Sequence, residues 1–316
     1  MARFAVRRIA NMIFVLFAIS VLTFLIFYKI PGGDPVLRIS GRTAEPAVRE
    51  QVREDFGFND PVYVQYARMM QKTLNGSLES YSNRVNVREE LIRGIPATAS
   101  LVIGAAIIWL FFGILFGVLS AVYAGRFPDR VITIVALIGI SLPIFWVGAL
   151  LLYYLTYKVS LFPAGGYVPL TEDPASWLSH LILPWFCLSI LFIGFYSRLL
   201  RSNMLDVMNE DYVRTARAKG LSERRVLLGH VMRNALIPIV TLFGLDFGAA
   251  IGGGAILTES VFGLQGVGQY VAESIGSLDL PPILGTTLYA AFLIVLLSAI
   301  VDIVYARLDP RVRLNA

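Results

Sequence analysis

The sequence contains few of the residues that carry enzyme chemistry. It has one cysteine, Cys187, and two histidines, His180 and His230, in 316 residues. One cysteine excludes a disulfide within the chain and a cysteine metal cluster, and two histidines outside an H-E-x-x-H motif argue against a histidine-based metal site. No G-x-x-x-x-G-K-[ST] motif occurs, so the chain lacks a P-loop for nucleotide phosphates. We therefore expect no enzymatic activity, no catalytic or metal-binding residues and no cofactor bound by this chain.

Charge is also scarce. Charged residues make up 16% of the chain and hydrophobic residues 56%, and the mean hydropathy is +0.68. This leaves too little polar surface to cover a water-soluble globule, so membrane lipid is the expected surroundings of most of the chain. In a membrane protein the formal net charge of +5 reports orientation, and we expect no nucleic-acid partner.

Six apolar runs are long enough to cross a hydrocarbon core of about 30 Å. The first, residues 9–30, follows three arginines and is too long for the apolar part of a signal peptide, so we expect it to remain as a helix. The others are residues 98–124, 131–157, 177–197, 235–258 and 282–306. The predicted fold is an all-α integral membrane protein with six transmembrane helices, kinked near Pro143, Pro184 and Pro238.

The distribution of basic residues predicts the orientation. With the N-terminus in the cytoplasm, the inner segments contain sixteen Lys and Arg, whereas the two short outer loops contain only Lys158. This asymmetry satisfies the positive-inside rule, from which the 66-residue segment 31–96 is excluded because long loops translocate regardless of charge. Both termini are therefore expected in the cytoplasm.

The same arrangement divides the chain into four parts. These are a tail and first helix (1–30), an extracytoplasmic segment (31–96), a transmembrane core (97–306) with a long inner loop (198–234), and a cytoplasmic tail (307–316). In the outer segment, Asp60 and Pro61 predict the start of a helix that ends before Gly76, and residues 49–56 and 87–93 are weaker helical candidates. This segment is either a tether packed on the spans or a surface that contacts a delivery partner.

A few polar and small residues stand out within the core. Asp246, inside the fifth span, either lines an aqueous path or hydrogen-bonds a neighbouring helix. Glycines at spacing four, which permit close helix packing, occur at Gly113 and Gly117 and again in the fifth span. After that span, residues 259–279 predict a folded outer hairpin or re-entrant element. The residues considered for a pathway or outer gate are Asp246, Glu259, Gly266, Gly268 and Asp279.

The inner loop has the pattern of a helix-turn-helix. Asn209 or Asp211 can cap a first helix that ends at Gly220, and Ser222 can cap a second helix that runs toward Asn234. An apolar edge within a basic surface suits docking into a groove of a soluble partner, or equally contact with anionic lipid. That edge consists of Tyr212, Val213 and Ala216.

The loop resembles the cytoplasmic EAA loop of ABC importer permeases. The residues 211–220, followed by His230, Arg233-Asn234-Ala235 and Pro238, are similar to the dipeptide/oligopeptide/nickel branch of binding-protein-dependent transport permeases, first-permease type. Further similarity covers nearly the whole chain, at residues 31–35, 61–66, 128–130 and 309–311. Arg214 and Arg233 stand where the general loop pattern has Glu and Pro, and residues 265–268 lack a proline common in the branch.

The resemblance implies a permease subunit of an ATP-driven importer of dipeptides or oligopeptides in the bacterial inner membrane. The implied partners are a second homologous permease, two P-loop ATPases that bind ATP and Mg²⁺, an extracytoplasmic substrate-binding protein and membrane lipid. Nickel chelates, glutathione and oligosaccharides are further substrate classes for such systems. The implied ATPase-coupling helix contains Asp211, Tyr212, Val213, Arg214, Thr215, Ala216, Arg217, Lys219 and Gly220. The alternative is an ion-coupled secondary transporter or channel that works without ATPases, against which the scarcity of ionisable residues in the spans argues.

Overall fold

The regular secondary structure of the protein is helical over the residues described by its computed structural model, which are 2–29, 35–40 and 45–308. No strand occurs in these ranges, and one isolated bridge joins Glu79 to Asn86. The residues 31–34 and the segment 309–316, both used for the resemblance or the predicted tail, lie outside them.

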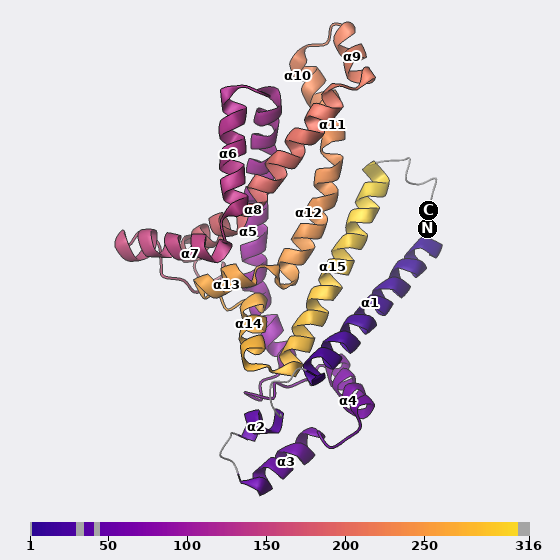
Figure 1. The fold of residues 1–316 in the computed structure, drawn as a ribbon, viewed down its shortest axis with the longest axis vertical. Coiled ribbons are helices and arrows are strands. Elements are labelled where there is room, and N and C mark those ends of the chain that lie inside the picture. Colours follow the sequence, from indigo (N-terminus) through magenta and orange to yellow (C-terminus); the bar gives the residue numbers. More distant parts are fainter. Residues whose placement is uncertain (1, 30–34, 41–44, 309–316) are drawn as a thin grey trace.

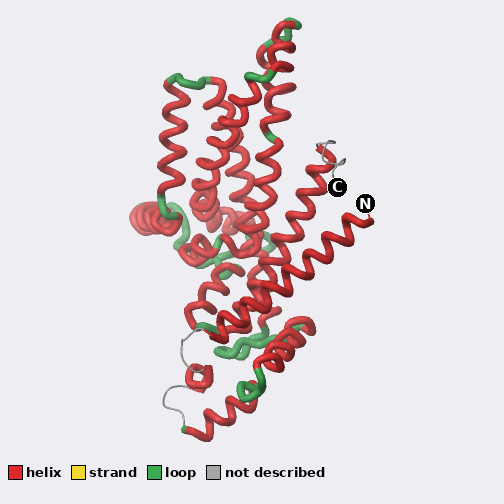
Figure 2. Tube along the Cα trace, turned by 45° about the vertical axis from the view of Figure 1, so that its right-hand side comes forward, coloured by secondary structure: helices red, strands yellow, loops and turns green. Residues whose placement is uncertain are grey.

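Figures 1 and 2 show an elongated bundle. Its helices are α1 (Ala2–Lys29), α2 (Pro35–Ser40), α3 (Pro46–Phe56), α4 (Val62–Asn75), α5 (Val87–Val122), α6 (Phe127–Ser141), α7 (Ile144–Leu151), α8 (Pro174–Met208), α9 (Asp211–Ala218), α10 (Glu223–Val226), α11 (Met232–Ala235), α12 (Ile237–Ala249), α13 (Ile256–Phe262), α14 (Val267–Ser277) and α15 (Leu280–Leu308), with π-helical segments at Leu152–Lys158, Leu227–Val231 and Ala250–Gly254.

Four helical segments are individually long and apolar enough to cross a membrane: Val87–Val122, Pro174–Met208, Ile237–Gly254 and Leu280–Ile300. A bent pair, Phe127–Ser141 and Ile144–Lys158, makes a fifth if it is counted as one span. Within α1 the described apolar stretch is Ala10–Ile26, which is shorter than the four spans. The all-α membrane fold is therefore confirmed, whereas the number of six spans is not.

The third apolar run is not one straight helix. The two halves meet at Leu142 and Pro143 with a bend of 98°, and α7 leaves the side of the bundle (Figure 1). Leu142 is extended, with φ −81° and ψ 130°, because the proline ring clashes with a helical conformation of the residue before it. The predicted kink at Pro143 is thus a sharp break.

Glycines bring α5 and α8 together at the centre of the bundle. A Cβ added to Gly113 would lie 2.8 Å from Tyr196 Cβ, and one added to Gly117 would lie 2.8 Å from Leu200 Cβ. The side chains of Tyr196 and Leu200 are fully buried. The predicted close packing of this glycine pair is therefore between two helices of the same chain, which fixes the core on which the loops are mounted.

The two ends of the bundle carry different structures. We call the end with α9 and α10 the loop end, and the end with α2, α3 and α4 the insertion end (Figures 1 and 2). At the insertion end, Tyr66 of α4 packs on α1, with its hydroxyl 2.7 Å from Ser20 Oγ and its ring 5.4 Å from that of Phe24.

Some helix limits differ from those predicted. Residues 87–93 are not a separate helix but the first turns of α5, because the Asn86 side chain caps α5 by accepting hydrogen bonds from the N–H groups of Arg88 and Glu89. At the loop end, α8 continues to Met208, so the loop begins about ten residues later than the predicted position 198.

Candidate functional site

The loop between α8 and α12 forms the predicted helix-turn-helix. Helix α9 begins after Glu210, the residue between the two predicted caps, and it ends at Ala218. Gly220 has φ +77°, a left-handed conformation that favours glycine and turns the chain toward α10. Ser222 occupies the cap position of α10 as predicted, although its side chain makes no capping hydrogen bond.

The apolar edge of α9 faces the chain's own core. The side chains of Val213 and Ala216 are 0% and 5% exposed, and they belong to the main apolar cluster together with Met204 of α8 and Val226 of α10. This differs from the expectation that this edge contacts a soluble partner or anionic lipid. The reason is that Val213 and Ala216, three positions apart, share one helix face, and that face covers the end of α8.

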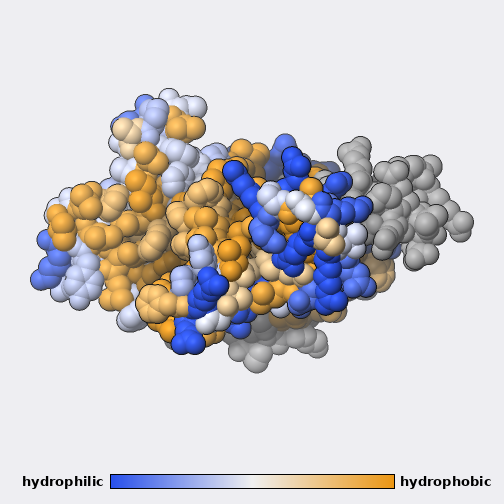
Figure 3. Space-filling view, turned by 90° about the horizontal axis from the view of Figure 1, so that it is seen from above, coloured by the Kyte–Doolittle hydropathy of each residue, from blue (hydrophilic) through white to orange (hydrophobic). Residues whose placement is uncertain are grey.

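The opposite face of α9 is polar and exposed. Asp211 and Arg214 lie 3.5 Å apart with side chains 98% and 67% exposed, and Arg217 pairs with Glu223 of α10 at 3.0 Å. The space-filling view along the bundle axis shows hydrophilic side chains gathered at this end (Figure 3). Thr215 and Lys219 are also exposed. The large apolar side chains exposed in the loop between α8 and α12 are Tyr212 and Leu228.

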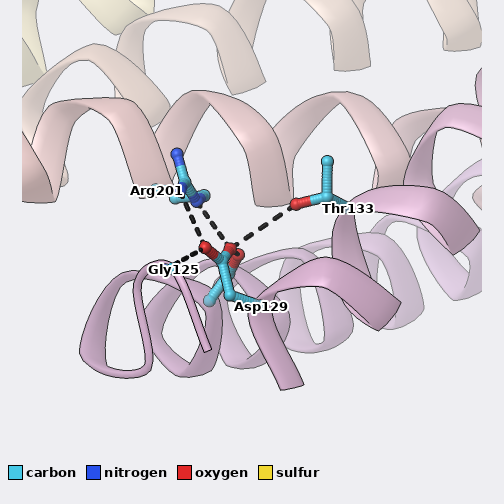
Figure 4. A network of polar contacts seen from close by, with 5 residues as sticks. Gly125, Asp129, Thr133 and Arg201 are labelled. Atoms are coloured by element: carbon cyan, nitrogen blue, oxygen red, sulfur yellow. Dashed lines mark hydrogen bonds and ion pairs between the residues drawn. The ribbon is translucent and has the colours of Figure 1, made fainter. Parts of the chain in front are cut away.

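An ion pair between the buried Asp129 and the partly exposed Arg201 joins the other connection at the loop end to α8. The Asp129 carboxylate, 6% exposed, accepts hydrogen bonds from Arg201 Nε at 2.7 Å and Arg201 Nη2 at 2.8 Å (Figure 4). It also accepts from the Gly125 N–H at 2.8 Å and from the Ser120 hydroxyl. Sequence reasoning used Asp129 only for the resemblance and missed this network, because its partners lie on three separate parts of the chain.

The hairpin after α12 consists of α13 and α14, held by the buried Glu259. Glu259 is 0% exposed; its carboxylate accepts hydrogen bonds from Thr98 Oγ1 of α5 at 2.7 Å and from the Gln269 N–H at 2.9 Å. Thr98 Oγ1 in turn accepts from the Val267 N–H at 2.9 Å. Burial raises the pKa of the Glu259 carboxyl, against the lowering effect of these hydrogen bonds.

The two glycines predicted at this hairpin leave room for the same carboxylate. A Cβ on Gly266 would come within 2.4 Å of Glu259 Oε2, and one on Gly268 within 3.0 Å of the same atom. Their roles are thus explained by the close approach of the α14 N-terminus to Glu259. The hairpin is docked on α5 through polar groups that sequence reasoning had considered for a pathway or gate.

Asp279 makes a second link of this kind. It precedes α15 and is 5% exposed, and it accepts hydrogen bonds from the Tyr81 N–H at 3.0 Å and the Ser82 N–H at 3.1 Å, as well as from the Ser80 hydroxyl. These donors lie in the loop before α5. Asp279 therefore ties the extracytoplasmic insertion predicted from the sequence to the last helix.

Asp246 hydrogen-bonds a neighbouring helix, the second of its two predicted roles. Its Oδ2 accepts from the Tyr196 hydroxyl of α8 at 2.7 Å, and the side chain remains partly exposed. The structure thus brings Gly266 and Gly268 to Glu259, and places Asp246 and Asp279 at separate helix junctions.

The fold and these sites were compared with known proteins. Residues 113–314 match the family model described as binding-protein-dependent transport system inner membrane component, and residues 1–102 match its N-terminal companion. The chain is 37% identical over 314 residues to a putative peptide transport system permease protein of Brucella abortus, covering 99% of both chains. It is 38% identical over 316 residues to the oligopeptide transport system permease protein AppB of Bacillus subtilis, again over 99% of both.

Two further comparisons agree. The di/tripeptide transport system permease protein DppB of Pseudomonas aeruginosa is 36% identical over 335 residues, with 99% of each chain covered. A solved structure of the inward-facing MetNI methionine ABC transporter has the same fold, with a TM-score of 0.53 over 69% of this chain and 96% of that chain at 16% identity. On the family match over more than half of its length, the chain belongs to the binding-protein-dependent transport system inner membrane components.

Proposed function

We propose that this chain is one permease subunit of an ATP-driven importer of peptides in the bacterial inner membrane. The peptide class is supported by the relatives, which are named as peptide, oligopeptide and di/tripeptide permeases and match the chain from end to end. The proposed assembly contains a second homologous permease, two P-loop ATPases and an extracytoplasmic binding protein. ATP and Mg²⁺ would bind only to the ATPases.

The observation that carries this proposal is the rigid, exposed mounting of α9. Its inner face is anchored by Val213 and Ala216 in the core that includes α8 and α10, while its outer face presents charged side chains and Tyr212. The exposed Leu228, in the π-helical segment that follows α10, extends this surface at the loop end. A helix held in this way transmits force. Closure of docked ATPases would displace α9 and rock the spans between inward-open and outward-open arrangements.

The first experiment tests assembly and coupling. We expect the tagged chain, purified gently from its native host, to bring P-loop ATPases and a sibling permease with it. The double substitution Arg214→Glu with Leu228→Asp is expected to remove the ATPases and reduce peptide uptake at least about tenfold. The first change reverses a charge at the proposed interface, and the second replaces an apolar contact by a charge. Membrane insertion should be unchanged because both side chains are exposed.

The matched control is Arg126→Glu, an exposed arginine at the same end but in the connection between α5 and α6. It should retain the ATPases. A chain that purifies alone and still transports without ATP would refute the proposal in favour of a secondary transporter. Uptake by the doubly substituted protein at the normal rate would refute the assignment of α9 as the coupling helix.

A second experiment tests the orientation, with the loop end in the cytoplasm. In a Cys187→Ala background, Gln265→Cys lies in the exposed turn before α14 and Ser222→Cys in the exposed turn before α10. An impermeant thiol reagent added to intact spheroplasts should label position 265 and leave position 222 unlabelled until the membrane is opened. The opposite labelling pattern would invert the orientation predicted by the positive-inside rule.

A further inference from the structure

A cavity of about 520 Å³ lies between α6 and α8 near the loop end. This volume is within the range of about 300 to 1,000 Å³ that is typical of sites for small ligands. Its lining combines two arginines and two hydroxyls with apolar side chains, a mixture that suits an amphipathic occupant. The lining residues are Thr133, Ile140, Phe195, Arg198, Leu199, Arg201 and Ser202.

The polar part of the cavity contains hydrogen-bond donors that have no acceptor among the described residues. Arg201 gives its Nε and one Nη2 hydrogen to Asp129, which leaves the rest of its five N–H bonds without a protein acceptor among the described residues. Arg198 is exposed and has no acceptor in that part of the chain. The guanidinium group binds phosphate oxygens in a planar, bidentate manner, so the cavity offers an anion site.

The polar and apolar parts lie at different depths along the bundle. Helix α6 starts at the loop end and α8 runs toward it (Figure 1), so Thr133, Arg198 and Ser202 lie nearer that end than Ile140 and Phe195. Seven residues separate Thr133 from Ile140, which is about 10 Å along a helix. Arg198 also follows immediately after the apolar run 177–197. We therefore expect the arginines at the level of the membrane interface, with Ile140 and Phe195 deeper.

We propose that this cavity binds an anionic phospholipid. The phosphate of the headgroup would contact Arg198 and the free N–H groups of Arg201, and an acyl chain would lie along Ile140 and Phe195. Basic pockets between transmembrane helices bind anionic headgroups in this way. A free anion would occupy only the polar half, whereas a phospholipid satisfies both halves. The site is separate from the exposed face of α9.

The charge around the cavity also favours an anion. Asp129 already pairs with Arg201, and Arg126 and Arg130 at the start of α6 are exposed at the same end. Asp206, one turn beyond Ser202 on α8, is the nearest further acid along that helix, and it makes no ion pair with Arg198. The local excess of arginine therefore attracts an anionic headgroup in preference to a zwitterionic one.

The experiment measures lipid retained by the full chain in its purified complex. After equilibration with vesicles of phosphatidylcholine containing phosphatidylglycerol, native mass spectrometry counts the lipids bound. We expect the wild type to retain phosphatidylglycerol. Arg198→Gln should lower the affinity for this lipid about fivefold, which is the contribution of one arginine at an anionic surface. Arg198→Lys should restore part of the affinity. Arg225→Gln, an exposed arginine of α10 outside the cavity, is the matched control and should retain the lipid.

A second measurement identifies the occupant in native membranes. Phe195, 45% exposed, is replaced by the photocrosslinking amino acid benzoylphenylalanine. An adduct with the mass of a phospholipid supports the proposal, whereas a protein adduct would show that another subunit covers the cavity and would overturn it. Equal retention of phosphatidylcholine and phosphatidylglycerol, or displacement of the lipid by inorganic phosphate alone, would also overturn it.

Discussion

Asp129→Ala is expected to lower the free energy of unfolding of the purified permease by about 3 kcal/mol, since each buried donor left without an acceptor costs about 1 to 3 kcal/mol. The substitution leaves the Arg201 guanidinium, the Ser120 hydroxyl and the Gly125 N–H without their shared acceptor. The connection between α5 and α6 should then loosen from α8. Denaturant titration followed by tryptophan fluorescence measures the change.

A double-mutant cycle isolates the ion pair from the rest of the network. Arg201→Met alone should be costly because Asp129 stays buried, whereas Asp129→Ala combined with Arg201→Met should recover part of the loss. Asp206→Ala removes an exposed carboxylate from the same helix and should change stability by less than about 0.5 kcal/mol. Additive effects of the two single substitutions would show that the pair contributes no coupling energy.

Glu259→Ala is expected to cost a similar amount, about 3 kcal/mol, and to reduce uptake. Truncation leaves the Gln269 N–H and the Thr98 hydroxyl without an acceptor in a buried site, at about 1 to 3 kcal/mol for each group. The hairpin of α13 and α14 would lose its link to α5 through Glu259 and retain the hydrogen bond from the Val267 N–H to Thr98. Thermal unfolding of the purified protein and uptake in cells measure the two effects.

The matched control for Glu259 is on the same hairpin. Glu273 of α14 is exposed and accepts a hydrogen bond from the Gln269 side chain, so Glu273→Ala should leave stability and uptake close to those of the wild type. Equal losses in the two variants would mean that burial of Glu259 has no energetic consequence.

Glu259→Gln tests the electrostatic part of the same link. Burial raises the pKa of Glu259 in the folded protein, so the folded state holds a proton that the unfolded chain releases. The contribution of Glu259 to stability therefore falls as the pH rises from the ordinary glutamate range through the raised pKa. Glutamine does not titrate, and the melting temperature of Glu259→Gln should depend less on pH in that window. An unchanged pH profile would contradict this cause.

Local features of the chain predicted much of the architecture. Hydropathy located the long helices, Pro143 located the break, and the turn residues at Gly220 and Ser222 located the helix-turn-helix. Each of these signals depends only on neighbouring residues, so it can be recognised without knowledge of the tertiary contacts. The predicted count of six spans is not confirmed for two reasons. The third apolar run is two helices joined by a sharp bend, and the described apolar stretch of α1, Ala10–Ile26, is shorter than the other spans.

The candidate site was predicted less completely. The sequence indicated α9 but assigned Val213 and Ala216 to an outer face, and the structure buries them. An apolar edge on a helix specifies that the edge is covered, and it does not specify whether the cover comes from the same chain or from a partner. Glu259, Gly266 and Gly268 are predicted for a possible pathway or outer gate, and that role stays a prediction; the structure adds that they hold the hairpin against α5.

By itself the sequence determined that this is a helical membrane protein of a transport family, because composition, apolar length and motif order need no three-dimensional information. Only the tertiary structure decided which polar residues meet. Asp129 and Arg201 are 72 positions apart, and Thr98 and Glu259 are 161 apart. Such pairs form where whole helices pack against one another, and local sequence periodicity does not encode which distant helix a given face will contact.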